Sequence, residues 1–180
     1  MLFKETKLKG VYIIEPEKSE DERGFLALSW AAKEFAAHSL DCRLVECNIS
    51  LNRCKGTLRG MHYQAPPYAQ PKLVRCTRGA IYDVALDLRP DSLSFKQWDA
   101  VELTQDNYLM FYIPAGCAHG YQSLVDNSEI FYQMSEVYVP QSARGVRWDD
   151  PAFGIRWPLQ NSIISDRDRT YPPFFSNSED

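Results

Sequence analysis

Residues 81–87, with the sequence IYDVALD, decide the fold class because their side chains alternate as those of a β-strand do. Successive side chains of a strand point to opposite faces, so Tyr82 shares one face with two aliphatic residues, whereas Asp83 and Asp87 lie on the other. A barrel whose interior mixes apolar walls with a few polar groups is typical of a ligand pocket. This segment therefore predicts a β-barrel wall that carries polar groups on one side.

Short runs of similar character recur along the chain and are separated by turn residues. The expected strands cover residues 9–15, 24–29, 43–51, 57–64, 72–77, 80–88, 97–103, 108–113, 119–124, 128–135 and 137–139. Turns are expected at Arg78-Gly79, Asp106-Asn107, Pro114-Ala115-Gly116 and Asp126-Asn127. Strands this short and this numerous predict an all-β sandwich or jelly roll.

Helical periodicity is rare, and its best example is the alanine-rich segment 30–38 (WAAKEFAAH). The tail after Trp148 is rich in proline and aromatic residues, so we expect it to wrap the barrel as irregular structure. No repeat, low-complexity segment or linker is visible. Residues 1–180 are therefore expected to form a single domain.

The composition excludes several classes of protein. Apolar residues make up 44% of the chain, which argues against intrinsic disorder, and aromatic residues make up 13%, which suits sheet faces and pockets for flat ligands. The net charge is −4 and no basic stripe is present, so we expect no nucleic-acid partner. A few well-placed arginines and lysines can still bind phosphate.

The five cysteines contain no CxxC pair, so neither a disulfide framework nor a zinc site is expected. The N-terminal residues 1–10 (MLFKETKLKG) lack the apolar core of a secretory signal. The longest uncharged run, 108–125, is interrupted by Pro114 and by glycines, and it predicts strand–turn–strand structure with no membrane partner. The cytoplasm is the expected compartment.

Two segments carry most of the chemistry, GTLRGMHYQ (56–64) and IPAGCAHGY (113–121). The second has the P-x-G-x-x-H spacing of the later cupin motif, in which a tight turn delivers a histidine into the barrel mouth. Metal-binding cupins also need an H-x-H element and a carboxylate, but here Gln64 takes the place of the second histidine of that element. The chain has only three histidines, so we expect no metal and leave His62 free to act as a base near its reference pKa of ~6.5.

Each candidate side chain also has a purely structural explanation. His62 by itself would suit a buried, hydrogen-bonded role, and Tyr132 would suit the apolar core. Lys72 would suit a solvated position on an edge strand, and Asp168 a solvated position in a charged tail. Strand phase offers one further hypothesis, that Asp83 is a partner of Lys72.

The segments GTLRGMHYQAPPYAQPKLVR, IYDVALDLR, IPAGCAHGY and FGIRWPL with SDRDR occur in the order and spacing typical of one family. Over nearly its whole length the chain resembles the dTDP-4-dehydrorhamnose 3,5-epimerases, and LRGMHYQ followed by KLVR is the most specific part of the match. The resemblance implies a cupin-type jelly roll or β-barrel with a few short helices. It also implies an isomerase that acts at C3, C5 or both of a nucleotide-diphosphate 4-keto-6-deoxyhexose, such as dTDP-4-dehydro-6-deoxyglucose, without a cofactor. No glycine-rich dinucleotide fingerprint is present.

The resemblance also implies roles for individual residues. His62 matches the general base, Asp168 its carboxylate partner, Tyr132 the acid on the opposite face of the sugar, and Lys72 the lysine near the enolate oxygen. The ligand-binding positions, mainly around the diphosphate, are Arg23, Arg59, His119 and Arg167, and Tyr138 matches a ring that stacks on the nucleobase.

Departures from the family pattern cluster at the ligand contacts. Leu28 and Ala143 stand where the family usually has glutamate, and the segment 45–50 reads VECNIS in place of VQDNHS. Within it, Glu46 and Asn48 are candidate substrate contacts, and a carboxylate at 46 suits a donor edge such as the cytosine amino group. A CDP-sugar is therefore an alternative to the dTDP-sugar.

Other readings also stay open. A sugar-nucleotide-binding cupin without turnover would need neither Tyr132 nor Asp168, and a metal-dependent oxygenase would need more ligands. The resemblance implies a homodimer in which an N-terminal strand is exchanged and Arg23 reaches the neighbouring pocket. It also implies a place in deoxysugar biosynthesis, of the rhamnose type, for a surface polysaccharide or a glycosylated metabolite.

Overall fold

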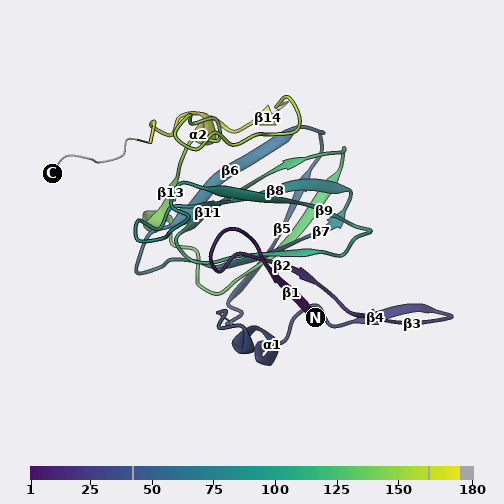
Figure 1. Ribbon diagram of the computed structural model, residues 1–180. Helices are drawn as coiled ribbons and strands as arrows, with labels where there is room; N and C mark the ends of the chain where they lie inside the picture. Colours follow the sequence, from purple (N-terminus) through teal and green to yellow (C-terminus); the bar gives the residue numbers. More distant parts are fainter. Residues whose placement is uncertain (42, 162, 175–180) are drawn as a thin grey trace.

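The computed structural model describes residues 1–41, 43–161 and 163–174 (Figure 1). Its longer strands are β5 (Glu46–Asn52), β6 (Thr57–Gln64), β7 (Lys72–Arg78), β8 (Ala80–Asp87), β9 (Trp98–Thr104), β11 (Cys117–Ser123) and β12 (Ser128–Met134). The shorter ones are β1 (Leu2–Glu5), β2 (Tyr12–Glu15), β3 (Lys18–Asp21), β4 (Gly24–Ala27), β10 (Met110–Ile113), β13 (Ala143–Gly145) and β14 (Ile163–Ile164). Two short helices, α1 (Ala32–Ala37) and α2 (Asp166–Arg169), and one 3₁₀ turn (Pro140–Ser142) complete the described part.

Two main sheets form the barrel. One has the strand order β1-β2-β10-β7-β12-β5, and the other has the order β13-β6-β11-β8-β9 with β14 added beside β6. All pairs are antiparallel except that of β14 with β6, which is parallel. The all-β jelly-roll prediction is confirmed, and the hairpin of β3 and β4 projects from the barrel (Figure 1).

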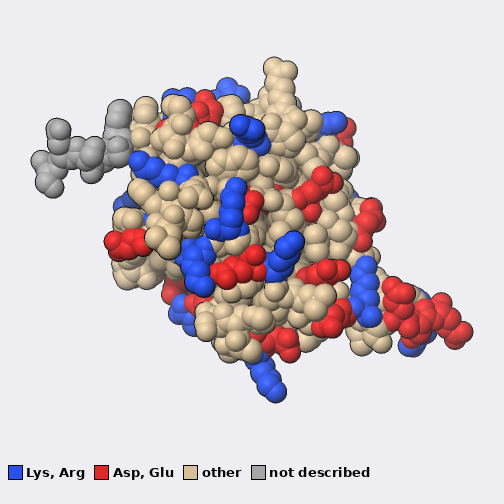
Figure 2. Space-filling model, in the orientation of Figure 1, with Lys and Arg blue, Asp and Glu red and all other residues tan. Residues whose placement is uncertain are grey.

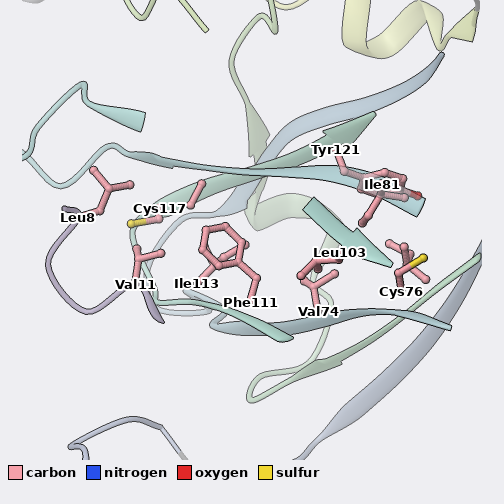
Figure 3. Close-up of a cluster of buried hydrophobic side chains, with 12 residues drawn as sticks. Leu8, Val11, Val74, Cys76, Ile81, Leu103, Phe111, Ile113, Cys117 and Tyr121 are labelled. Atoms are coloured by element: carbon pink, nitrogen blue, oxygen red, sulfur yellow. The ribbon is translucent and has the colours of Figure 1, made fainter. Parts of the chain in front are cut away.

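The main core lies between the two sheets (Figure 3). It contains side chains from both walls, including Val74 and Phe111 of one sheet and Ile81 and Leu103 of the other. The alternation predicted for 81–87 is confirmed, because Ile81 faces this inner core while Val84 joins a second cluster on the outer face. At roughly 25 cal/mol per Å² of buried apolar area, such clusters are the main source of stability.

Each sheet is also covered on its outside. The C-terminal segment packs Val146 and Phe153 against Val84 and Leu86 of β8. Helix α1 buries Phe35 on the outer face of the sheet that contains β2, β10 and β7. There Phe35 belongs to the cluster that contains Leu73, Ile14, Met110 and Tyr112. The helix predicted for 30–38 is confirmed over its central residues. The inner faces of the two sheets enclose the main core and a cavity.

The structure corrects several strand predictions. Residues 137–139 do not form a strand, because β12 ends at Met134 and the chain turns away toward the 3₁₀ turn. The strand expected from 108 begins only at Met110, since Tyr108 has a φ of 57°, outside the β region. Strands β1 and β3 were not predicted, and the tail contains two ordered elements, β14 and α2, where only irregular structure was expected.

The structure bears on three expectations drawn from composition, which concern the cysteines, membrane-spanning helices and surface charge. Among the described residues, Cys47, Cys54, Cys76 and Cys117 are free thiols, and Cys42 lies outside the described part. None of the helices that the structure describes is long and apolar enough to span a membrane. On the face shown in Figure 2, Lys and Arg are interspersed with Asp and Glu, so that face carries no basic stripe.

The neighbouring strands β6 and β11 leave no room for a side chain between Gly60 and Gly120. His62 pairs with His119 and Arg59 pairs with Tyr121, so one extra residue of β6 lies opposite Gly120 and forms a β-bulge. A Cβ atom on Gly60, whose φ is +138°, would lie 2.5 Å from the Cα of Gly120. The bulge changes the phase of β6, and this lets Arg59 and His62, three residues apart, line the same cavity.

The close contact between Gly60 and Gly120 gives a prediction about stability. We expect Gly60→Ala to lower the free energy of unfolding by about 3 kcal/mol, since overpacking and a strained backbone each cost roughly 1–3 kcal/mol. Gly154→Ala is the control, because Gly154 also has a positive φ of 60° but no atom within 4 Å of an added Cβ, so about 1 kcal/mol is expected. Urea unfolding measures the stability of both variants. Equal losses of stability would contradict a close contact between β6 and β11 at Gly60.

Candidate active site

A cavity of about 410 Å³ opens between the two sheets. This volume lies within the range of small-molecule pockets. Its lining residues are Ser50, Thr57, Leu58, Arg59, His62, Lys72, His119, Tyr121, Ile130, Tyr132, Ile163, Ser165, Arg167 and Asp168. Of the eleven predicted site residues, the cavity brings together His62, Lys72, Tyr132, Asp168, Arg59, His119 and Arg167.

His62 and Asp168 form a close pair although 106 residues separate them in the chain. His62 Nε2 lies 2.6 Å from Asp168 Oδ1, while Asp168 Oδ2 accepts from the backbone N–H of Gly60 at 3.2 Å. Ser165 caps α2 by accepting from the backbone N–H of Asp168. Both carboxylate oxygens are therefore engaged, and the solvated alternative for Asp168 is wrong.

The pair has a defined protonation pattern. Burial of the Asp168 carboxyl raises its pKa, but the hydrogen bonds from His62, Gly60 and Ser165 outweigh burial and leave the pKa below its usual value. An ionised carboxylate only accepts, so His62 Nε2 carries the proton and Nδ1 is left as an acceptor. The His62 side chain is 35% exposed against 4% for Asp168, so the imidazole is the accessible member of the pair.

Tyr132 and His62 come from opposite walls of the cavity. Tyr132 lies on β12, in the sheet that contains β7, and His62 lies on β6, in the sheet that contains β8. Both side chains line the same cavity. A sugar bound between the two sheets would therefore have an imidazole on one side and a phenol on the other.

Lys72 is the first residue of β7, which lies between β10 and β12 in the centre of its sheet. The alternative of a lysine on an edge strand is therefore wrong. Burial lowers the Lys72 pKa to about 8, against the opposing charge of Asp83. A substantial fraction of Lys72 is thus still an ammonium near neutral pH, in a site where charge interactions are strong.

A second histidine–carboxylate pair lies beside the first. His119 Nε2 is 2.6 Å from Asp83 Oδ1, and both side chains are buried. Burial lowers the His119 pKa despite the carboxylate, so this ring is neutral near pH 7. The hydrogen-bond partner of Asp83 is thus His119, and its relation to Lys72 is one of charge alone.

Two arginines bring positive charge to the cavity. Arg59 Nε donates to Asn52 Oδ1 at 2.8 Å, and Arg167 Nε donates to Tyr171 Oη at 2.8 Å. Each guanidinium is thereby tethered through Nε, and Arg167 also hydrogen-bonds Tyr138. A planar guanidinium is the side-chain group best suited to bind phosphate oxygens. The hydroxyl groups of Ser50 and Tyr121 lie 2.9 Å apart and form a hydrogen bond with each other, which completes this wall.

Sequence reasoning missed the residues Ser50, Asn52 and Tyr121 of this wall. Tyr121 stands in the quoted IPAGCAHGY segment, two residues after His119, so strand phase alone would have placed both on one face. Ser50 and Asn52 carry no motif, and only the pairing of β5 with β12 brings Ser50 to the cavity and Asn52 to the buried position from which it holds Arg59.

A smaller adjoining hollow of about 150 Å³ shares His62, Lys72, Tyr132 and Arg167 with the main cavity. Asn48, Tyr138 and Ala143 line it, and the Tyr138 side chain is about half exposed. Glu46 does not line either hollow, and its Oε1 accepts from the backbone N–H of Tyr138 at 3.1 Å. Glu46 therefore orders the segment that carries the ring.

Arg23 is not brought to the cavity of its own chain. It lies at the end of the β3–β4 hairpin, 84% exposed, and it pairs with Asp21. Leu28 is likewise exposed and outside the cavity. His38 stacks on Phe3 at 4.0 Å, away from the other two histidines, and no group of three potential metal ligands lies together among the residues that the structure describes.

Known proteins share this fold and sequence. A curated dTDP-4-dehydrorhamnose 3,5-epimerase from Sinorhizobium fredii is 40% identical over 173 residues, which cover 96% of this chain and 89% of the relative. A crystal structure with the same description from Elizabethkingia anophelis is 37% identical, with a TM-score of 0.94 and coverage of 97% and 96%. A 3′-monoepimerase from Streptomyces bikiniensis in complex with dTDP-quinovose is 31% identical, with a TM-score of 0.85 and coverage of 93% and 85%.

Fold and sequence together define a cupin-type epimerase, an isomerase. The sequence profile of the family described as dTDP-4-dehydrorhamnose 3,5-epimerase matches residues 5–176. The chain belongs to this family.

The His62–Asp168 pair gives a prediction that reads the tautomer directly. In Asp168→Asn the amide can donate to Nε2, so the ring proton moves to Nδ1 and the base nitrogen is blocked. We expect kcat to fall by roughly 10²–10⁴-fold and ¹⁵N NMR to show the proton on Nδ1. Asp166→Asn, on the same helix but outside the cavity lining, is the matched control and should change neither. An unchanged His62 tautomer in Asp168→Asn would contradict this account.

Proposed function

We propose that the protein inverts C3, C5 or both of a nucleotide-diphosphate 4-keto-6-deoxyhexose by proton transfer between His62 and Tyr132. The observation that carries this proposal is the placement of an imidazole and a phenol on opposite walls of one cavity of about 410 Å³. Inversion needs a proton to leave one face of the sugar and return to the other. A protein that only bound the sugar would need no such opposed pair.

The 4-keto group makes the hydrogens on C3 and C5 acidic. Nδ1 of His62 takes one of these protons, the C–H bond breaks, and its electron pair moves onto the C4 oxygen as an enolate. Asp168 stabilises the resulting imidazolium through the hydrogen bond at Nε2. Lys72 donates a charge-assisted hydrogen bond to the enolate oxygen, which is strongest where water is excluded.

Tyr132 completes the inversion from the other wall. Its phenol is a general acid that can give its proton to the carbon. The enolate collapses to the ketone, a new C–H bond forms with the phenolic proton, and solvent returns a proton to the phenolate. His62 releases its proton to solvent, so the step needs no net oxidant or reductant.

The nucleotide would extend from the main cavity into the adjoining hollow. Arg59 and Arg167 would bind the diphosphate, Tyr138 would stack on the base, and Asn48 would contact the nucleoside. The relatives named for dTDP-sugars support thymine as the base. The alternative of a CDP-sugar loses support, because the Glu46 carboxylate already holds the Tyr138 backbone.

One or two inversions fit the same set of residues. The family description supports inversion at C3 and C5, and the 3′-monoepimerase relative supports inversion at C3 alone. Both supply a building block for deoxysugar biosynthesis, of the rhamnose type in the first case, for a polysaccharide or another glycosylated product. The cytoplasmic location stays a prediction.

Isotope exchange tests the two roles separately. In heavy water, with dTDP- and CDP-linked 4-keto-6-deoxyglucose as substrates, we expect deuterium at C3, C5 or both of the dTDP-sugar by NMR. His62→Asn should abolish exchange. Tyr132→Phe should keep exchange but slow inversion by roughly 10²-fold or more, because His62 then returns the isotope to the same face.

Tyr82→Phe is the control for that experiment, because Tyr82 packs in the outer cluster against Trp157 and not in the cavity. It should behave as the unaltered protein. Binding of the sugar nucleotide without any deuterium incorporation would identify a non-catalytic binding protein and end the proposal.

A second copy of the chain completes the site in this proposal. The β3–β4 hairpin projects into solvent with Arg23 near its tip, and β5 leaves the edge of its sheet exposed, with Ile49 70% accessible (Figure 1). Exposed sheet edges pair readily with other strands. A homodimer that exchanges this segment would bring Arg23 to the partner's cavity.

Mixing two inactive variants tests the dimer. If Arg23 acts in the partner's site, Arg23→Ala and His62→Asn chains that are unfolded and refolded together should recover about a quarter of the normal activity, since half of the dimers are mixed and each has one intact site. Each variant refolded alone is the control. No recovery in a confirmed mixed dimer would show that Arg23 serves only its own chain.

A further inference from the structure

The Asp83 carboxylate is fully buried and has no task in the reaction as described so far. It lies on β8, on the strand face that points between the sheets. Its Oδ1 binds His119 at 2.6 Å, but its Oδ2 is buried and has no hydrogen-bond partner among the described residues. A buried carboxylate with an unbonded oxygen costs free energy, so a structure that keeps one has a compensating charge nearby.

Lys72 lines the same cavity as His119, the hydrogen-bond partner of Asp83, and it is the cation whose charge is coupled to Asp83. The negative charge of Asp83 favours the ammonium form of Lys72, against the burial that disfavours it. The same charge reaches the Cys76 thiol on β7, whose pKa is raised to about 11 by burial and, to a lesser degree, by Asp83. Asp83 therefore acts across the barrel interior, from one sheet to the other.

The other charged groups around the cavity do not replace Asp83. Arg59 and Arg167 line it as cations and disfavour an additional positive charge. The Asp168 carboxylate is taken up by His62 and by the Gly60 backbone. Burial lowers the pKa of His119 and raises the pKa of Tyr121, so these two side chains of the lining carry no charge near pH 7.

We propose that Asp83 is a positioning residue for the epimerisation, and that its carboxylate keeps Lys72 as an ammonium under the C4 oxygen while it fixes the ring of His119. This inference rests on the proposed function. Because Oδ1 accepts from Nε2–H, His119 is held with Nδ1 as an acceptor on the cavity wall, able to receive a hydroxyl group of the sugar.

The change Asp83→Asn removes the charge but keeps an oxygen that can accept from His119. Without the carboxylate the Lys72 pKa falls from about 8, so the ammonium is lost at lower pH. The fall of kcat/KM on the alkaline side should then occur roughly one pH unit or more lower than in the unaltered protein. Activity at pH 6 should change least, and activity at pH 8–9 should drop about tenfold or more.

Lys72→Arg separates this electrostatic effect from a structural one. Arginine stays protonated throughout the range, so in this background the alkaline fall assigned to Lys72 should disappear, and adding Asp83→Asn should no longer change the shape of the profile. A uniform loss of activity at every pH in Asp83→Asn, with the alkaline fall in place, would mean that Asp83 only supports the fold and would overturn the proposal.

A second measurement is independent of turnover. Competitive acetylation of the whole folded protein across pH, with mass spectrometry of the peptide that contains Lys72, gives the pKa of that amine. A value near 8 in the unaltered protein and a lower one in Asp83→Asn supports the proposal. A value near the ordinary ~10.4 in the unaltered protein would overturn it, even if the variant does not fold. If no sugar nucleotide is turned over while this shift is observed, the proposed function fails and the Asp83–Lys72 coupling stands.

Discussion

The close contact between the paired strands β6 and β11 at Gly60 and Gly120 is the constraint on which the site depends. Two glycines, Gly60 and Gly120, let the strand backbones approach, and the bulge at this point shifts the phase of β6 by one residue. As a result Arg59 and His62 both face the cavity, and the Gly60 N–H is free to bind Asp168. One local distortion of the sheet thus places a cation, an imidazole and the anchor of its carboxylate partner.

Two histidine–aspartate pairs of equal length have different surroundings and therefore different properties. His62 is partly exposed, and its carboxylate partner is bound by several donors, so the ring is held in place and is accessible from the cavity. His119 is buried beside an incompletely bonded Asp83 and stays neutral. The same two residue types thus provide a proton carrier in one position and a fixed hydrogen-bonding wall in the other, and burial decides which.

Much of the fold could be read from the sequence, because period-two alternation identifies strands such as β8 independently of their partners. The failures have physical causes. Residues 137–139 have the β-branched composition of a strand, but they lie where the chain leaves the barrel, and no neighbouring strand pairs with them. The candidate site was largely predicted through family motifs, whereas Ser50 and Asn52 depend on the register of β5 with β12, which no local pattern specifies.

The C-terminal segment has a consequence for how the protein loses activity on heating. Asp168 reaches His62 from a four-residue helix, and few contacts join this helix and the two-residue strand β14 directly to the barrel, although Phe153 and Phe174 on either side of them pack against it. Elements with so few contacts open at lower free energy than the core strands. Detachment of this segment would leave the barrel intact but would separate the His62 imidazole from the Asp168 carboxylate. Warming would then silence the enzyme below the temperature at which the β-sheets melt, and the loss would reverse on cooling.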